Sequence, residues 1–176
     1  LMMIQNTNIP LNIPYIFETN LHPNIIKLID ILNIKKRPII FLSGQKIYTI
    51  NEVIIPSDLS MIVDSYLNGK EKNESTISIE LIKQAKDKIL KYFNPKKRKN
   101  KKNIYVRRPN SYRILKNQIE VEKKLKKIGF EIIEVEQLSI KEQIEIFINA
   151  KLIVTPTGAH ITNIIWALPE TRVFVI

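Results

Sequence analysis

Apolar residues follow two different periods along the second half of the chain. Short, mostly apolar runs, typical of buried strands, occur at 104–106, 131–135, 152–155 and 172–176. Between these runs, apolar residues recur every three or four positions, which predicts helices at about 116–128, after Ser139 and at 159–168. Strands that alternate with helices favour an α/β fold with a parallel sheet and right-handed crossovers.

Local signals predict how two of these helices begin and end. Gly129 follows the first helix and is expected to act as its C-terminal cap. Ser139 precedes the second helix, and Glu142 stands three residues further on. This spacing is typical of a capping box, in which each residue satisfies a backbone N–H group of the other.

The first half of the chain is less regular. Three prolines interrupt residues 1–24. The expected elements are a helix at 25–32, strands at 38–42, 46–49 and 52–55, and a helix at 78–93. This change of pattern predicts a partial N-terminal domain with a linker at 1–75 and a Rossmann-like domain at 76–176. The second domain ends on an apolar strand without a covering helix, so we expect it to be truncated at the C-terminus.

Composition disfavours several classes of protein. The chain contains no Cys, so it has neither a disulfide framework nor a Cys-ligated metal site. No apolar run approaches the ~20 residues of a membrane-spanning helix, and the first residues lack the pattern of a signal peptide. We expect a cytoplasmic protein that can rest on the inner face of the membrane through its lysines.

Positive charge is concentrated in the second half. Residues 91–176 contain 18 Lys and Arg against 8 Asp and Glu, whereas residues 1–90 contain 10 against 9. This imbalance indicates an anionic partner, which could be a nucleotide, a nucleic acid or a membrane surface. The densest part, 95–102, is compatible either with a solvated loop or with a patch that binds a polyanion or anionic lipid.

Two predicted strand ends carry chemistry suited to phosphate. Arg107 and Arg108 follow the strand at 104–106, and Arg113 and Asn117 come soon after. The segment 155–163 follows the strand at 152–155 and combines Pro, Gly and Thr before a predicted helix. Guanidinium groups and backbone N–H groups at a helix start both bind phosphate. Alternatively, the arginines are ordinary surface residues, and the segment 155–163 is an ordinary strand–turn–helix crossover.

These segments together resemble glycosyltransferase family 61. The resemblance rests on the order and spacing of five motifs over 103–176: a strand ending in Arg107, the run 113–117, the run 129–133, the run 138–144, and the loop 156–163. A weaker likeness covers 48–56. Three positions depart from the usual pattern, namely Thr157, Gln118 and His160.

The resemblance implies a GT-B architecture and an inverting transfer from a UDP-sugar to a glycan or lipid-linked acceptor. It implies no required metal and no cofactor other than the nucleotide-sugar co-substrate. The residues that it places around the donor are Arg107, Arg113, Asn117, Thr157, Gly158, Ala159, Thr162 and Asn163. We expect Arg113 and Gly158 to lie close enough to share one pyrophosphate.

The catalytic base stays unassigned at this stage. His160 could act as a base, but the alternative is that it caps the start of the helix or faces solvent. Asp58 and Asp64 are the nearest candidate carboxylates, although Asp in such loops commonly forms turns. Two other functions remain open: a basic nucleic-acid-binding α/β module, and an inactive fragment of a glycosyltransferase. Nucleic acid is the less favoured partner, because Phe93 and Tyr105 fall in predicted elements rather than on a stacking surface.

Overall fold

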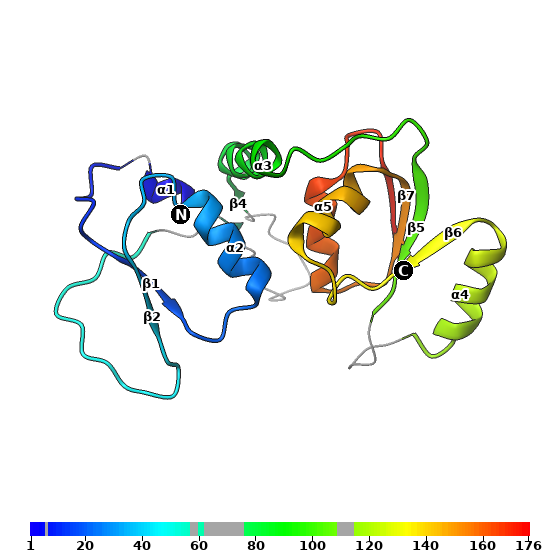
Figure 1. Cartoon of the computed structure of the whole chain (residues 1–176). Coiled ribbons are helices and arrows are strands. Elements are labelled where there is room, and N and C mark those ends of the chain that lie inside the picture. Colours follow the sequence, from blue (N-terminus) through cyan, green and yellow to red (C-terminus); the bar gives the residue numbers. More distant parts are fainter. Residues whose placement is uncertain (6, 57–59, 62–75, 109–114) are drawn as a thin grey trace, which may run out of the picture. The chain divides into compact units, whose positions relative to one another are not determined.

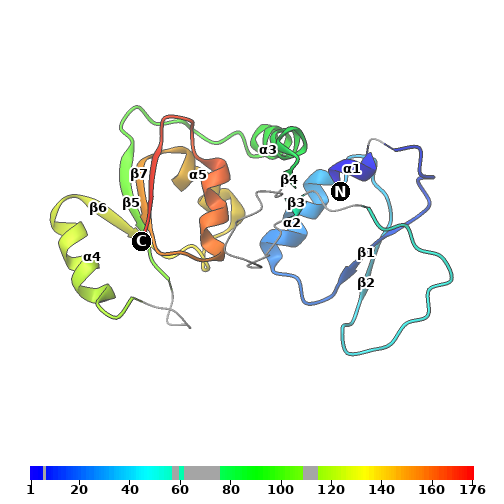
Figure 2. The same ribbon diagram turned by 180° about the vertical axis from the view of Figure 1, so that it is seen from behind.

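The computed structural model describes residues 1–5, 7–56, 60–61, 76–108 and 115–176. The chain divides into two compact units, Leu1–Tyr92 and Phe93–Ile176. Figures 1 and 2 show the elements of both units from opposite sides. The domain division expected near residue 75 falls outside the described residues and stays a prediction.

The first unit combines helices with two small sheets. Its elements are α1 (Met2–Gln5), β1 (Tyr15–Glu18), α2 (Pro23–Leu32), β2 (Ile39–Leu42), β3 (Ser60–Met61), β4 (Thr76–Ile77) and α3 (Ile79–Phe93), whose last residue belongs to the second unit. β1 and β2 pair in parallel, whereas β3 and β4 pair antiparallel. The helices predicted at 25–32 and 78–93 and the strand predicted at 38–42 are confirmed.

The strands predicted at 46–49 and 52–55 are wrong. Both segments are irregular, and Ile47 and Ile55 are 100% and 80% exposed. Alternating apolar residues form a strand only where a neighbouring strand completes the hydrogen bonds and another layer covers one face. Within the described residues, β1 takes β2 as its partner instead. β1 and α1 were not predicted from the proline-interrupted segment 1–24.

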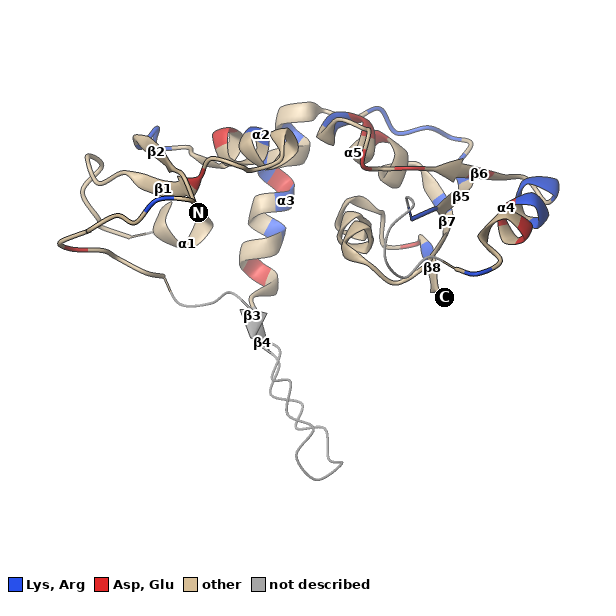
Figure 3. Ribbon diagram, turned by 90° about the horizontal axis from the view of Figure 1, so that it is seen from below, with Lys and Arg blue, Asp and Glu red and all other residues tan. Residues whose placement is uncertain are grey.

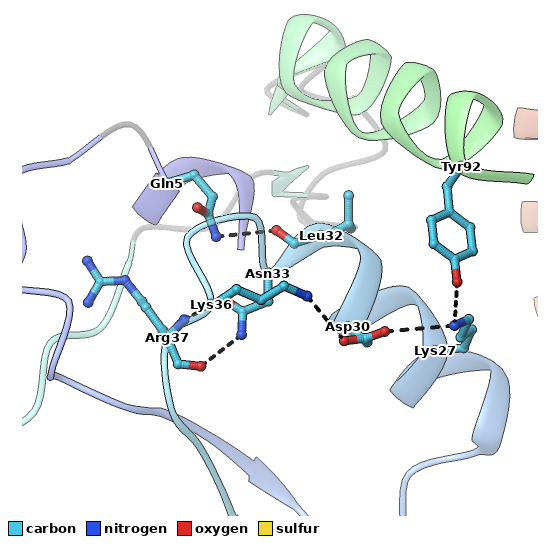
Figure 4. Close-up of polar contacts among 8 residues, drawn as sticks. All are labelled: Gln5, Lys27, Asp30, Leu32, Asn33, Lys36, Arg37 and Tyr92. Carbon is cyan, nitrogen blue, oxygen red and sulfur yellow. Dashed lines mark hydrogen bonds and ion pairs between the residues drawn. The ribbon is translucent and has the colours of Figure 1, made fainter.

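A buried arginine holds the irregular N-terminal segment of the first unit. The guanidinium of Arg37 donates hydrogen bonds to the carbonyl oxygens of Ile9, Pro10 and Ile13. The backbone of Arg37 is fixed in turn by the Asn33 side chain, which accepts from its N–H at 2.9 Å and donates to its carbonyl at 2.8 Å (Figure 4). One guanidinium thus satisfies carbonyl groups that have no strand partner.

The second unit is a four-stranded parallel sheet in the order β6-β5-β7-β8. Its strands are β5 (Lys102–Val106), β6 (Phe130–Ile133), β7 (Ala150–Thr155) and β8 (Arg172–Val175). The helix α4 (Gln118–Lys127) lies on one face, while α5 (Ile140–Ile148) and the 3₁₀ helix η2 (Ala159–Trp166) lie on the other (Figures 1 and 2). The predicted parallel α/β arrangement and its four strands are confirmed.

The core of the second unit lies between the two central strands and α5. Three successive residues of β5, Ile104 to Val106, are at most 1% exposed, which is typical of a parallel strand covered on both faces. The α5 side chains that pack there are Ile144, Phe147 and Ile148. Both predicted caps are confirmed: Gly129 adopts a φ of 87° after α4, and Ser139 and Glu142 form the capping box of α5.

The segment predicted as a helix at 159–168 is instead the shorter 3₁₀ helix η2. Thr162 Oγ1 donates to the carbonyl of Ala159 at 2.8 Å, and Asn163 Nδ2 donates to the carbonyl of His160 at 3.3 Å. These side-chain bonds occupy carbonyl groups three residues back and compete with α-helical pairing. The β-branched residues Ile161, Ile164 and Ile165 further lower the preference of this segment for an α-helix.

We expect the Ser139→Ala substitution to lower the stability of the second unit by about 1 kcal/mol at neutral pH, because it removes the cap of α5. In the folded protein, hydrogen bonds from the Ser139 hydroxyl and backbone N–H hold the pKa of Glu142 below its ordinary value of 4.5. Stabilisation by a carboxylate with a lowered pKa is present above the unfolded-state pKa and is lost as the pH falls through the folded-state pKa. The stability difference between wild type and variant should therefore shrink below about pH 4.5.

Urea unfolding at a series of pH values measures this difference. Glu136→Gln is the control, because Glu136 is an exposed carboxylate outside the capping box. A difference for Ser139→Ala that stays constant from neutral to acidic pH would contradict the role assigned to Glu142.

Candidate functional site

The carboxyl ends of β5 and β7 lie next to each other in the second unit. The two strands pair in parallel, with Tyr105 opposite Val154. The arginine pair after β5 and the loop after β7 therefore meet at the same edge of the sheet. Ligands of open parallel sheets bind at this edge, which makes it the candidate site.

Arg108 connects these two segments. Its guanidinium Nη1 donates a hydrogen bond of 2.9 Å to the carbonyl oxygen of Thr157. The carbonyl of Arg108 in turn accepts a hydrogen bond of 3.3 Å from the buried side chain of Gln118, the first residue of α4. The guanidinium of Arg108 is thus held beside the loop at 156–158, although Arg108 and Thr157 are 49 residues apart.

Gly158 is required by close packing in this loop. A Cβ atom at this position would lie 2.9 Å from Cε1 of His160, 3.0 Å from its Nδ1 and 3.3 Å from Cζ of Arg108. Contacts shorter than 3.0 Å do not occur for a Cβ without a shift of the neighbouring atoms. The absence of a side chain therefore allows the guanidinium and the imidazole to approach the same stretch of backbone.

His160 has a structural position in this arrangement. It is 8% exposed, and its Nε2 lies 2.9 Å from the carbonyl oxygen of Pro156 and 2.7 Å from Oγ1 of Thr155. Because a carbonyl oxygen can only accept, we assign the proton to Nε2. The Thr155 hydroxyl can then donate to the carbonyl of Val106 at 3.2 Å. The imidazole thus ties the end of β7 to the first turn of η2.

Arg107 faces a different group of side chains. Its Nε lies 3.5 Å from Oε1 of Glu122 in α4 and 3.6 Å from Oε2 of Glu134 after β6. One guanidinium beside two carboxylates gives a formal charge of −1, which does not attract a phosphate. In this conformation Arg107 links α4 and β6 to the central strand, and its predicted contact with the donor stays a prediction.

The hydroxyl of Tyr105 lies close to this acidic group. Tyr105 is completely buried, and its hydroxyl has no hydrogen-bond partner in the part of the chain that the structure describes. Burial and, to a smaller extent, the Glu122 carboxylate raise the pKa of Tyr105, so the hydroxyl stays protonated at neutral pH. The sequence pattern placed Tyr105 correctly in the core but did not indicate its acidic neighbour.

Strand alternation explains why the two neighbouring arginines differ. Consecutive side chains of an extended chain point to opposite faces of a sheet. The backbone N–H of Arg107 still pairs with β6, donating to Ile133 at 2.9 Å, so the extended geometry of β5 continues to this residue. Arg107 therefore contacts α4 on one face, whereas Arg108 contacts the loop before η2 on the other.

The other predicted donor residues are placed as follows. Thr157, Ala159 and Thr162 are exposed near the start of η2, whereas Asn163 is buried and bonded to the carbonyl of His160. Asn117 is exposed at the N-cap of α4 and makes no side-chain capping bond. Arg113 lies outside the described residues, as do Asp58 and Asp64, so the expected proximity of Arg113 and Gly158 stays a prediction.

A shallow hollow of about 190 Å³ lies away from this edge. It is lined on the α5 face by Arg98, Lys102, Glu131, Glu142 and Asn149 among others. Lys102 is paired with Glu131, and Glu142 is held in the capping box of α5. The hollow contains neither Arg108 nor Gly158. We therefore do not assign it as the anion site.

No helix in the described part of the chain has both the length and the apolar character needed to span a bilayer. Among the same residues, no cluster of three or more His, Cys, Asp or Glu side chains could hold a metal ion.

The second unit is therefore an α/β domain whose parallel sheet carries a guanidinium and a glycine loop at its carboxyl edge. Comparison with protein families extends this conclusion. Residues 61–174 match the family model described as glycosyltransferase 61, and the chain belongs to this family. Membership indicates glycosyltransferase activity and confirms the resemblance found in the sequence. A search of curated proteins found no match.

We expect Gly158→Ala to destabilise the second unit by about 1–3 kcal/mol, because the added methyl group overlaps the His160 ring. Adding His160→Ala removes two of the three crowded atoms. The double variant should therefore lose less stability than the sum of the two single variants. Urea unfolding of the four proteins measures this coupling.

Gly129→Ala is the matched control. It introduces a methyl group at a φ of 87°, where no atom lies within 4 Å, and should cost about 1 kcal/mol through backbone strain alone. Its effect should add to that of His160→Ala without coupling. Additive effects for Gly158→Ala and His160→Ala would show that the close packing in the loop does not matter for stability.

Proposed function

We propose that the chain is part of an inverting glycosyltransferase that uses a UDP-sugar, and that the carboxyl edge of the second unit binds the diphosphate of this donor. The observation that supports this proposal is the contact of Arg108 with the loop at Thr157 and Gly158. A guanidinium offers parallel N–H donors to phosphate oxygens and keeps its charge at any physiological pH. Family membership supplies the reaction class.

The start of η2 supplies a second kind of phosphate donor. The first hydrogen bond of this helix runs from the N–H of Ile161 to the carbonyl of Gly158, at 3.0 Å. The N–H groups of Ala159 and His160 therefore precede the first intrahelical bond, and no side chain caps this end. Such N–H groups are suited to an anion. Thr157 and Thr162 add exposed hydroxyl groups beside them.

In the proposed reaction, an acceptor hydroxyl attacks the anomeric carbon of the sugar from the side opposite UDP. A bond forms between the acceptor oxygen and this carbon, and the bond from the carbon to the phosphate oxygen breaks. The acceptor proton passes to a base that we leave unassigned, and UDP leaves as an anion. Arg108 and the loop N–H groups would stabilise the charge that develops on this leaving group. In this reaction, protein groups rather than a metal ion would stabilise the leaving group.

The rest of the proposed enzyme follows from the same family relationship. We propose a GT-B arrangement in which 76–176 belongs to the donor domain and 1–75 to a partial acceptor-side domain with its linker. The acceptor would be a glycan or a lipid-linked glycan in the cytoplasm. Arg113 and Asn117 are proposed as further donor contacts, because both belong to the motif that carries the resemblance.

A thermal-shift measurement with UDP tests the proposal. At a UDP concentration about 100 times its dissociation constant, wild-type protein should gain about 2.7 kcal/mol of stability. Arg108→Ala should lose most of this gain, because it removes the guanidinium beside Gly158. Arg107→Ala should instead lower the stability of the protein without ligand, because it leaves Glu122 and Glu134 without their cation.

Arg172→Ala is the matched control, since Arg172 is exposed at the opposite end of the strands and should not affect the response to UDP. Single-stranded oligonucleotide serves as the competing ligand. Salt-sensitive stabilisation by oligonucleotide, without a response to UDP, would favour a nucleic-acid-binding module over the proposed enzyme. A response to neither ligand would favour an inactive fragment.

A further inference from the structure

Basic side chains gather at the amino edge of the second unit, opposite the candidate donor site. Each parallel strand of the sheet begins at this edge, and α4 ends there because it runs back from the end of β5 to the start of β6. In Figure 3, Lys and Arg positions, coloured blue, follow one another on α4 and along the segment that leads into β5. The exposed basic residues at this edge are Lys96, Lys97, Arg98, Lys99, Lys102, Lys126, Lys127, Lys151 and Arg172. We call this set the amino-edge basic surface.

The lysine-rich segment is fixed to the fold by one buried side chain. Asn149, which is 7% exposed at the C-cap of α5, accepts a hydrogen bond of 2.6 Å from the N–H of Arg98. The same side chain donates to the carbonyl of Lys96 at 3.0 Å, and its backbone carbonyl accepts from the N–H of Lys102 at 3.0 Å. This backbone is ordered before any partner binds, which lowers the entropic cost of binding.

Acidic residues neutralise only part of this surface. Lys102 pairs with Glu131, and Lys101 pairs with Glu170. The hydrogen bond from Lys101, together with the charges of Lys101 and Lys97, holds the pKa of Glu170 below its ordinary value. In the described part of the chain, no ion pair involves Lys96, Lys99, Lys126, Lys127 or Lys151.

An exposed apolar side chain lies within the same surface. Ile128 follows Lys126 and Lys127 directly, and it is 68% exposed at the C-terminal end of α4. A large apolar residue beside lysines suits the boundary between lipid headgroups and acyl chains. A nucleic acid would instead require exposed rings for stacking. Among the described residues of the second unit, Phe174 in β8 is the one exposed aromatic residue, which is too few rings for a stacking surface.

We propose that the amino-edge basic surface binds an anionic lipid bilayer, with the lysines contacting the headgroups and Ile128 inserting between them. Each lysine near an anionic membrane strengthens binding about fivefold, and the attraction falls off within a Debye length. Several lysines on one ordered edge therefore suffice for reversible attachment. This inference does not depend on the proposed function, since it can be tested without nucleotide.

The common direction of the strands determines how the second unit would be oriented on a bilayer. The five residues of β5 separate the amino edge from Arg107 and Arg108 by roughly 16 Å. A bilayer that contacts the amino edge therefore lies away from the loop at 156–158, which is at the opposite edge of the sheet. Attachment at this edge is compatible with entry of a soluble nucleotide-sugar from the aqueous phase.

Co-sedimentation of the full chain with vesicles tests this inference. The vesicles contain either phosphatidylcholine alone or three parts phosphatidylcholine to one part phosphatidylglycerol. Wild-type protein should bind only the anionic vesicles, and binding should weaken as salt rises. Replacing Lys96, Lys97 and Lys99 together by Gln should lower the partition coefficient roughly 100-fold. As a separate variant, Ile128→Ser should also weaken binding, but without changing the dependence of binding on salt.

Two control variants match these changes in charge and hydrophobicity. Lys83, Lys88 and Lys91 are exposed on α3, and their joint replacement by Gln removes the same charge from another part of the chain. Ile119→Ser removes an isoleucine that is 84% exposed at the opposite end of α4. Vesicle binding should be much less affected by the α3 variant than by the triple variant at 96–99, and unaffected by Ile119→Ser.

Three results would overturn the inference. The first is equal binding to neutral and anionic vesicles. The second is equal loss of binding in the α3 variant and in the triple variant at 96–99, which would indicate an effect of net charge rather than of this surface. The third is tight, salt-sensitive binding of single-stranded oligonucleotide through the same lysines, with no binding to anionic vesicles. A response to UDP in the thermal-shift measurement is independent of all three.

Discussion

The parallel pairing of β5 with β7 is the constraint on which the candidate site depends. It brings Arg108 to the loop at Thr157 and Gly158, although the two segments are far apart in the sequence. The register also decides which arginine arrives there, because consecutive side chains of an extended chain face opposite sides of the sheet. A slip of one residue would exchange the environments of Arg107 and Arg108. Arg107 would then turn away from Glu122 and Glu134 and toward the loop.

Most of the second unit could be predicted from the sequence because its signals are local and consistent. The apolar run of β5 is buried on both faces and β7 carries the fully buried Ile153, so the pattern alone identifies both strands. Gly129 and the pair Ser139 and Glu142 mark helix ends through bonds within a few residues, which makes them predictable without knowledge of the fold. The segments at 46–49 and 52–55 show the limit of this approach. Their alternating pattern satisfies the local rule, but a strand also needs a partner, and pairing is a property of the whole chain.

The chemistry at the sheet edge was predictable by residue type but not in its details. Guanidinium groups and a glycine loop at adjacent strand ends were expected, and the structure places Arg108 and Gly158 together. The sequence could not show that Glu122 and Glu134 form ion pairs with Arg107, because both carboxylates belong to segments that approach Arg107 only after folding. It also left the role of His160 open. The structure assigns His160 a structural role, because its ring is buried and its Nε2 donates to the carbonyl of Pro156 in the loop. The spacing of Thr162 and Asn163 from the carbonyls that they bind could have indicated the 3₁₀ helix.

The direction of the strands connects the two proposals. In a parallel sheet every strand begins at one edge and ends at the other, so groups at strand starts and groups at strand ends lie on opposite sides of the unit. In the second unit, most lysines stand before or at the start of strands or near the end of α4, whereas the arginine pair and the glycine loop follow strands. Lysine is a mobile point charge that suits a fluid surface of headgroups, whereas the planar guanidinium suits a phosphate held in one position. Under the two proposals, two kinds of anion would bind at opposite edges without competition. The same backbone polarity would keep a nucleotide site accessible while the opposite edge rests on a membrane.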